Sequence, residues 1–229
     1  MELMSVENEN VSTSRFKKRW IIWGAFVTIT LVLGFMLRDY VVPSTWNYKV
    51  TVQIDTPKGM VEGHSISQLS NRPKIIKGYN TGNPAKYRGQ AVVVNLPTQK
   101  RVFALISPSI FYKAFPHEGG VTTRAGIKYH KRLKAGIQIE SINLPMKFVY
   151  FEDDKDARSL KVISRDEFST FLGEGVTLSN IIVEKTKKTP ERTSIENKLP
   201  ANIKSQEFWE WLSGLEYSDP RRLSISSFK

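Results

Sequence analysis

The stretch WNYKVTVQID at residues 46–55 alternates apolar and polar side chains with a period of two. Successive side chains of a β-strand point to opposite faces, so this pattern predicts a strand with one buried face. The turn sequence TPKG follows at residues 56–59 and places Pro and Gly where a tight turn favours them. Residues 60–69 are therefore expected to return as the second strand of a hairpin.

Further strands are expected downstream, separated by short turns. Residues 90–96 contain the run AVVV, which is typical of a strand buried on both faces, and residues 102–106 are the expected hairpin partner. Residues 146–151 and 160–163 form a second expected pair around an acidic turn. Residues 176–183 are a further expected strand, so the sheet is predicted to be mainly antiparallel.

Two short helices are predicted from their caps and their apolar spacing. Ser164 and Glu167 form the sequence pattern of a capping box, and Gly173 supplies a stop. In residues 205–215, apolar side chains recur at the i, i+3, i+4 and i+7 spacing of one helix face. Hairpins in series with two short helices predict an α+β fold.

Several regions lack such periodicity and are rich in Gly, Pro or polar residues. Long loops are expected at about residues 70–89 and 108–136. Residues 185–200 and a flexible tail after residue 218 are expected to be exposed. No long linker divides the apolar segments, so residues 38–229 are expected to form one domain.

Upstream of the sheet, residues 20–37 contain no ionisable side chain and are mostly apolar. As a helix, this run would extend over roughly 27 Å, close to the bilayer's hydrocarbon thickness of about 30 Å. It therefore predicts a transmembrane helix with aromatic anchors at the two interfaces. The expected anchors are Trp20, Trp23, Tyr40 and Trp46. The alternatives are a cleaved signal peptide, although the run exceeds a usual signal core, and a buried helix of the domain.

The charges that flank this run predict its orientation. Four basic residues precede it, whereas only Arg38 and Lys49 follow closely. The four residues expected to set the topology are Arg15, Lys17, Lys18 and Arg19. By the positive-inside rule, residues 1–19 are a cytoplasmic tail, and the domain lies in the periplasm of a bacterium, anchored in the inner membrane. Small residues four positions apart in the run would allow homo-oligomers through the membrane helix.

The composition of the 229-residue chain excludes several classes of protein. Lys and Arg total 34 against 22 Asp and Glu, for a net charge of +12, and 40% of the residues are hydrophobic. This balance is typical of a folded chain instead of a disordered one. Because the chain has no cysteine, it has no disulfide scaffold, thiolate zinc site, iron–sulfur cluster or thiol nucleophile.

The sequence shows no recognisable constellation for catalysis, a cofactor or a metal. His64, His117 and His130 are widely spaced and have no second ligand type beside them. The acidic group at residues 152–156 lacks the spacing and the glycine of a calcium loop. Gly63-His64-Ser65 begins like a nucleophile elbow, but adjacent strand residues point to opposite faces. No catalytic, cofactor-binding or metal-binding residue is therefore predicted, and an enzymatic role is left open but not favoured.

Basic residues form the remaining functional signal. The predicted anion-binding residues are Lys128, His130, Lys131, Arg132 and Lys134, together with Lys185, Lys187 and Lys188. They are expected either to bind an anionic envelope component or an acidic partner protein, or to be solvated loop residues. Nucleic acid would suit the charge but not the expected compartment.

Several segments of the expected domain share a pattern with other chains. They are the strand that ends in Thr56-Pro57 and Gly59, RGQAVVV at residues 88–94 with VFAL at 102–105, and FLGEGV at 171–176. These segments resemble a family of uncharacterised bacterial proteins. Residues 182–200 are similar to the family's C-terminal pattern, except that Ala201 stands where a Trp is expected. The resemblance implies a short membrane-anchored or exported chain with an N-terminal hydrophobic segment, and it implies no activity.

Together these patterns lead to one functional hypothesis and two alternatives. The hypothesis is a non-enzymatic, single-pass inner-membrane protein whose basic periplasmic domain binds an envelope component or a partner protein. The alternatives are an envelope-acting hydrolase with a site spread over several loops, and an accessory subunit of a larger membrane complex. A cleft with converging Asp, Glu or His side chains would favour the hydrolase.

Overall fold

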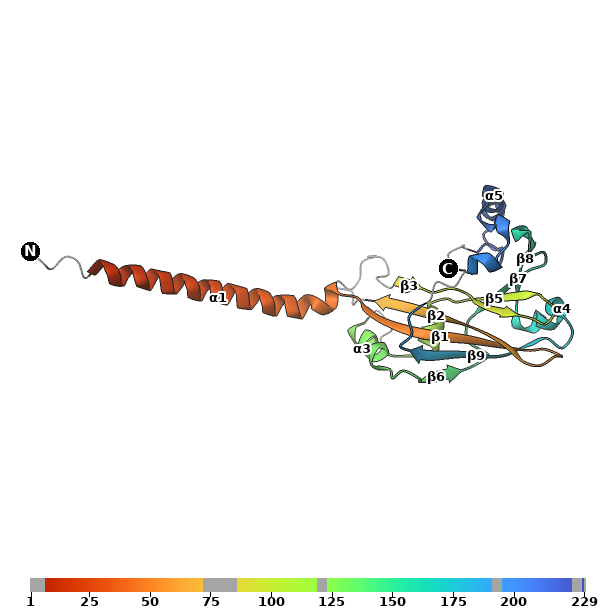
Figure 1. Ribbon diagram of the computed structural model, residues 1–229, viewed down its shortest axis with the longest axis horizontal. Coiled ribbons are helices and arrows are strands. Elements are labelled where there is room, and N and C mark those ends of the chain that lie inside the picture. Colours follow the sequence, from red (N-terminus) through yellow and green to blue (C-terminus); the bar gives the residue numbers. More distant parts are fainter. Residues whose placement is uncertain (1–6, 72–85, 119–122, 191–194, 224–227, 229) are drawn as a thin grey trace, which may run out of the picture. The chain divides into compact units, whose positions relative to one another are not determined.

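The computed structural model describes residues 7–71, 86–118, 123–190, 195–223 and 228, which Figure 1 draws in colour. The side chains of residues 7–19, 21 and 39–41 fall outside this description. The chain divides into two compact units, Met1–Pro43 and Ser44–Lys229. Both sheets and the candidate site lie in the second unit.

The first unit contains one long helix, α1 (Glu7–Val41). Among the residues that the structure describes, no helix is both long enough and apolar enough to cross a membrane. This finding overturns the transmembrane helix predicted for residues 20–37, and with it that part of the predicted fold. The prediction treated the apolar run as a separate helix, whereas the run is part of a longer one. The helix starts earlier because residues 7–19 contain no glycine or proline that would end it.

The second unit has an α+β fold with two antiparallel sheets. The larger sheet has the strand order β3-β2-β1-β9-β6, and Figure 1 shows β2, β1 and β9 side by side. Its strands are β1 (Ser44–Asp55), β2 (Val61–Asn71), β3 (Lys86–Arg88), β6 (Gln138–Glu140) and β9 (Thr177–Thr186). The β1–β2 hairpin is confirmed, with Ile54 opposite Val61. The sequence does not predict β3 or β6, because three residues are too few to show a period.

The smaller sheet has the order β4-β5-β7-β8 and consists of the two other expected hairpins side by side. Its strands are β4 (Val92–Asn95), β5 (Arg101–Leu105), β7 (Lys147–Phe151) and β8 (Leu160–Ile163). Phe103 pairs with Val93 on one side and with Val149 on the other, so β5 lies between β4 and β7. Both faces of this sheet are covered, which explains the continuous apolar runs of its strands.

Two apolar cores use the opposite faces of the smaller sheet. The first combines side chains from both sheets and includes the inward face of β1 that the alternating pattern predicts. These buried residues of β1 are Trp46, Tyr48, Val50, Val52 and Ile54. The second core joins Phe103 and Phe151 of the smaller sheet to Phe208 and Leu212 of α5 (Gln206–Gly214).

The two sheets approach each other closely where β4 passes β2. A Cβ atom at Gly63 of β2 would collide with the backbone carbonyl of Val93 in β4. Glycine therefore permits the approach, because it has no Cβ. Two residues further along β2, Ser65 Oγ donates a hydrogen bond of 2.8 Å to the carbonyl of Gln90.

Both predicted helices are present. Ser164 and Glu167 form the expected capping box, with Ser164 N donating to Glu167 Oε2 at 2.8 Å, at the start of η2 (Arg165–Glu167) and α4 (Phe168–Leu172). At the start of α5, Ser205 Oγ accepts from Phe208 N at 3.1 Å. The other short helical turns are η1 (Ala157–Ser159), η3 (Ile195–Lys198) and η4 (Ala201–Lys204).

The loop predicted at residues 108–136 is wrong, since it contains α2 (Ser109–Ala114) and α3 (Arg124–Arg132). Each helix is short, and the segment is interrupted by glycines, so its local pattern resembles a loop. Ile110, Phe111 and Ile127 are nevertheless buried in the first core, and this burial stabilises helices that are too short to be stable alone. Residues 72–85 of the other predicted loop lie outside the described residues.

The end of the chain also departs from the expected flexible tail. Phe228 is buried in the second core, with its ring centroid 6.0 Å from that of Phe103 and 6.4 Å from that of Phe151. Its carbonyl accepts a hydrogen bond of 3.2 Å from Ala91 N. The apolar area that this aromatic side chain buries offsets the entropy lost by ordering Phe228.

Candidate functional site

The helix α3 has one buried side and one exposed basic side. Thr123 caps its N-terminus, where Thr123 Oγ1 accepts from Gly126 N at 3.1 Å. Ile127 and His130, three positions apart, are buried on the side that faces β1. Tyr129 and Leu133 are partly buried, whereas the basic positions between and after Ile127 and His130 are exposed. We call the four exposed cations here the basic surface: Lys128, Lys131, Arg132 and Lys134.

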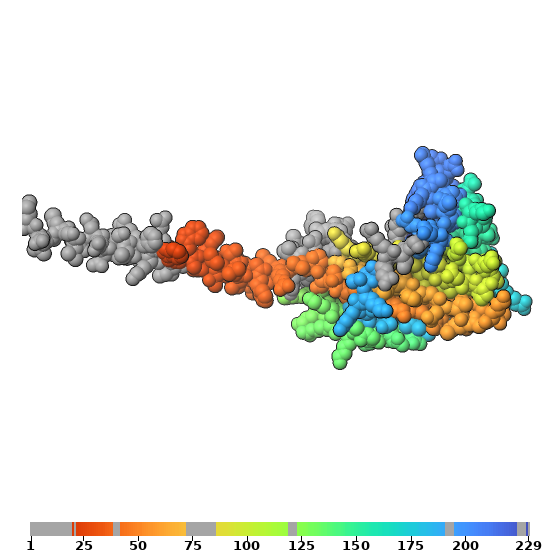
Figure 2. All heavy atoms as spheres, in the orientation of Figure 1, coloured from red at the N-terminus to blue at the C-terminus, as the bar shows by residue number. Residues whose placement is uncertain are grey.

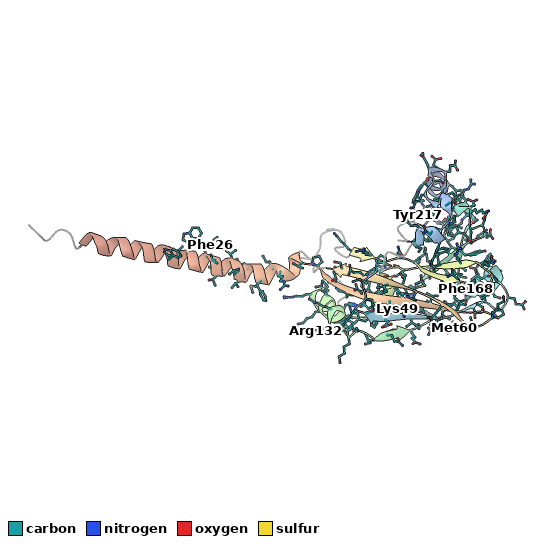
Figure 3. All side chains as sticks on the ribbon, viewed as in Figure 1. Phe26, Lys49, Met60, Arg132, Phe168 and Tyr217 are labelled. Atoms are coloured by element: carbon teal, nitrogen blue, oxygen red, sulfur yellow. The ribbon has the colours of Figure 1, made fainter. Side chains whose placement is uncertain are left out.

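The positive charge of the basic surface is not neutralised within the described part of the chain. None of its four residues forms an ion pair with a carboxylate there. Lys131 and Arg132 lie in the last turn of α3, where the partial negative charge of the helix end favours cations. Figure 3 shows Arg132 on α3 at the margin of the domain. The surface is therefore free to attract an anionic partner.

A shallow groove of about 590 Å³ lies beside the basic surface. Arg132 and Lys134 are the two charged residues in its lining, and the remaining lining is aromatic or aliphatic. Those other lining residues are Tyr129, Leu133, Ala135 and Ile137. The surface area of Ile137 is 42% exposed to solvent, so apolar area is accessible to a partner. In Figure 2 the green segment that contains α3 and β6 forms part of the visible surface.

Two residues predicted to bind anions at the surface are buried instead. His130 has no exposed area, and Lys185 retains only 7%. His130 lies on the inward side of α3, and Lys185 follows Val183 at the next inward position of β9. The prediction that these two residues bind anions at the surface is therefore wrong. A cluster of basic residues in the sequence does not reveal which side of a helix or strand each residue occupies.

Aromatic side chains enclose the His130 imidazole. Its ring stacks on Trp46 with centroids 5.6 Å apart and an angle of 9° between the planes. Tyr112 and Tyr129 contact it edge-on, at 5.9 and 5.3 Å. Tyr48 Oη and His130 Nδ1 share a hydrogen bond of 2.8 Å, whose donor depends on the imidazole tautomer. Burial, assisted by the positive charge of Lys185, lowers the pKa of His130 to about 4, so the ring is neutral at pH 7.

The Lys185 ammonium lies against the same aromatic group. Its Nζ is 5.1 Å from the ring centroid of Tyr48 and 6.0 Å from that of Trp46, which are cation–π distances. Among the described residues no carboxylate pairs with it. Burial lowers its pKa to about 8, so roughly one amine in ten is uncharged at pH 7. A free amine is a nucleophile, but its burial restricts access by a substrate.

Several buried polar atoms of this cluster have no hydrogen-bond partner among the described residues. They are Trp46 Nε1, His130 Nε2 and Tyr112 Oη. His117 Nδ1 is a fourth such atom, and the His117 ring contacts the ring of Tyr129. Each such atom carries a desolvation cost. The cluster therefore places polar atoms inside the first core, and the surrounding aromatic packing must offset the free-energy cost of their desolvation.

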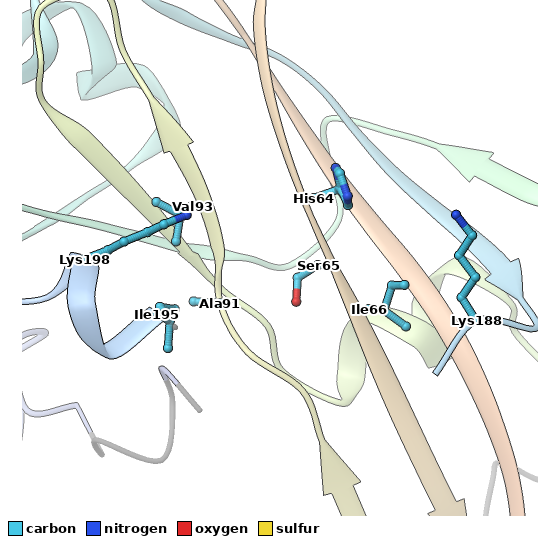
Figure 4. Close-up of a pocket in the computed structure, with 8 residues that line it drawn as sticks. All are labelled: His64, Ser65, Ile66, Ala91, Val93, Lys188, Ile195 and Lys198. Atoms are coloured by element: carbon cyan, nitrogen blue, oxygen red, sulfur yellow. The ribbon is translucent and has the colours of Figure 1, made fainter. Parts of the chain in front are cut away.

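The remaining predicted basic residues lie elsewhere. Lys187 and Lys188 follow β9 and are exposed. Lys188 lines a separate pocket of about 160 Å³ together with His64, Ser65 and Lys198, shown in Figure 4. The figure shows Ser65 on the side of β2 toward Ala91, whereas His64 lies on the other side. His64 and Ser65 are thus separated, as the strand alternation predicts, and Ser65 Oγ is bonded to Gln90 instead.

The structure describes only part of the residues assigned to a membrane interface. Trp20 and Trp23 are exposed on α1. Trp46 is a core residue of β1, with 3% exposure, and cannot serve as an interface anchor. The side chains of Tyr40 and of the four predicted topology residues lie outside the description. Those four are Arg15, Lys17, Lys18 and Arg19.

The groove and the strand β6 are the functional features that sequence reasoning missed. A signal for α3 was present, since Thr123 is a capping residue and Ile127, His130 and Leu133 recur at helical spacing. β6 left no such signal. Among the described residues, no group of three or more His, Asp or Glu side chains could hold a metal ion.

Comparison of the chain with models of protein families, with curated proteins and with solved structures gives no match.

Proposed function

We propose that residues 44–229 form a non-catalytic binding domain that recognises an acidic protein partner through the basic surface. The observation that carries this proposal is the basic surface, whose four cations on and just after α3 form no ion pair within the described residues and lie next to an apolar groove. Clustered charges of one sign raise the local concentration of an oppositely charged partner and speed its association. The net charge of the whole chain, +12, acts in the same direction.

The groove favours a protein partner over an anionic glycan or a lipid headgroup. A polyanion without apolar groups would pair with Arg132 and Lys134 but would leave Leu133 and Ile137 exposed to water. An acidic polypeptide segment supplies carboxylates for the cations and aliphatic side chains for the groove. Burial of apolar area contributes about 25 cal/mol per Å², so covering the groove adds to affinity.

The test compares ligand classes on the full chain. The probe is a synthetic peptide that alternates glutamate and valine, and its competitors are heparin and phosphatidylglycerol vesicles. Calorimetry should show binding of the peptide that weakens as salt is added, because exposed charges are screened. Stronger binding of heparin or vesicles than of the peptide would overturn the proposal.

A charge-reversed variant locates the site. Substitution of all four residues of the basic surface by Glu should weaken peptide binding by at least about tenfold. A matched control reverses the same amount of charge at four exposed lysines elsewhere: Lys58, Lys86, Lys147 and Lys155. Equal losses in the two variants would show that only net charge matters, and the assignment to α3 would then be abandoned.

A further inference from the structure

The strand β6 forms an edge of the larger sheet beside the groove. It is last in the order β3-β2-β1-β9-β6 and pairs with β9 on one side only. Among the described residues no strand pairs with its other side. Figure 1 shows β6 at the border of the sheet, below β9. An open edge of this kind presents backbone groups that can pair with another chain.

The register shows which backbone groups of β6 face outward. Lys185 N donates to the Ile137 carbonyl at 2.9 Å, and Ser141 N donates to the Ile181 carbonyl at 3.0 Å. Residues of an antiparallel pair alternate between bonding the neighbouring strand and pointing away from it. Ile137, Ile139 and Ser141 therefore bond toward β9. The N–H and C=O groups of Gln138 and Glu140 point to the open edge.

A β-bulge sets the start of this edge. Gly136 N donates to the Lys185 carbonyl at 2.8 Å, so Gly136 and Ile137 both lie opposite one residue of β9. Gly136 has φ of +90°, a conformation that glycine adopts readily and other residues rarely do. The bulge joins the end of α3 to β6 and keeps the lining residue Ile137 next to the open edge.

The side chains on one face of this edge match the groove. Ile137 and Ile139 lie two positions apart and therefore on the same face, with 42% and 39% of their area exposed. Ile137 also lines the groove, where Arg132 and Lys134 provide the charge. One face of the edge is thus apolar and flanked by cations. On the other face, Gln138 Nε2 donates to Glu140 Oε1 at 2.9 Å.

We infer that the acidic partner binds in an extended conformation, as an added strand on β6, with alternate aliphatic side chains in the groove. This inference rests on the proposed function and specifies how the partner is held. Backbone hydrogen bonds to Gln138 and Glu140 provide affinity, and the groove and the basic surface provide specificity. A second copy of this chain is a poorer occupant, because it would bring a second basic surface and a net charge of +12.

The experiment removes one outward N–H without touching the bonds to β9. Proline at position 138 lacks the N–H that points to the open edge, and proline is tolerated at such edge positions. Gln138→Pro should weaken binding of the glutamate–valine peptide by at least about fivefold, as expected for losing a backbone hydrogen bond. Gln138→Ala is the matched control, because it removes the same side chain but keeps the N–H, and it should bind like the wild type.

Hydrogen exchange of the full chain gives an independent measurement. Peptide binding should slow exchange of the Gln138 and Glu140 amides, which point to the open edge and pair with no other described strand. Glu140→Pro removes the second outward N–H. It is the variant to test if circular dichroism shows that Gln138→Pro is unfolded.

The possible outcomes separate the inference from the proposed function. If the Glu variant of the basic surface loses binding while both proline variants bind normally and exchange is unchanged, strand addition is wrong but the proposed function stands. If the Glu variant also binds normally, both are wrong. Concentration-dependent dimers that the proline variants abolish would identify a second copy as the occupant and overturn the inference.

Discussion

The two sides of α3 carry the same kind of residue in opposite environments. On the outward side, Lys131 is exposed and unpaired in the described part of the chain. On the inward side, His130 is fully buried and shares an aromatic enclosure with Lys185 of β9. Tertiary burial, and not the basic sequence cluster, therefore decides which of these residues a partner could contact. We propose that the outward side attracts ligands, whereas the inward side lowers stability unless its aromatic neighbours compensate.

The largest expected effect on stability comes from removing an aromatic ring that packs against His130 on the inward side of α3. Trp46→Ala should lower the free energy of unfolding by about 3–5 kcal/mol, because a buried ring is lost from the first core and a cavity remains. Urea unfolding of the full chain, followed by circular dichroism, measures this change. Trp209, which is 41% exposed on α5, is the control, and Trp209→Ala should cost far less. Similar losses for the two tryptophans would contradict the assigned core.

Protonation of His130 gives the next effect. Its folded pKa of about 4 is below the unfolded value of 6.5, so the unfolded state binds a proton first as pH falls. The stability of the wild type should therefore decrease between pH 6.5 and pH 4, by up to about 3 kcal/mol from this group. His130→Gln should have a visibly flatter profile over this window, whatever its stability at pH 7. Parallel profiles of wild type and variant would show that this imidazole is not buried.

Removal of the buried ammonium should raise the free energy of unfolding, whereas Trp46→Ala lowers it. The folded pKa of Lys185 is about 8 against 10.5 when exposed, so the unfolded state retains the proton longer and stability rises from pH 8 to pH 10.5. Lys185→Met should stabilise the chain at pH 7 by about 1–3 kcal/mol and remove that rise. Lys187→Met changes an exposed lysine two positions away and serves as the control. Destabilisation by Lys185→Met would mean that the cation–π contacts outweigh the cost of burial.

The smallest effect on stability is expected on the outward side. Lys128→Ala replaces an exposed residue of the basic surface and should change the free energy of unfolding by no more than about 0.5 kcal/mol. The same unfolding measurement applies. A loss of the size expected for Trp46→Ala would show that Lys128 packs against the domain, and the comparison between the two sides of α3 would fail.

Local patterns account for much of the fold. The alternation in residues 46–55 correctly places Trp46, Tyr48 and Val50 on the inward face of β1, since each strand position is assigned by parity alone. The Ser164–Glu167 capping box is correct because both hydrogen bonds join residues three apart. The helix α3 was missed because Gly126 interrupts its first turn and because burial against β1, not local propensity, stabilises it. The transmembrane helix was predicted from a run of apolar residues considered apart from the longer helix that contains it.

The candidate site was less predictable than the fold. The basic residues of α3 and the loop after it were recognised from composition, but the predicted set included the buried His130 and Lys185. The groove required Tyr129 and Leu133 to lie beside Ile137, which depends on how the chain returns to β9 after the bulge at Gly136. A periodic sequence pattern cannot predict this pairing of β6 with β9, because its hydrogen bonds join residues about fifty positions apart in the sequence.

The net charge, the absence of cysteine chemistry, the main strands and the two capped helices follow from local sequence, because each depends on composition or on neighbours a few residues apart. Which cations are buried, where the groove lies and which backbone edge is open all depend on how distant segments pack. Burial and strand pairing are set by contacts between such segments, and these contacts determine both the pKa of Lys185 and the open edge of β6.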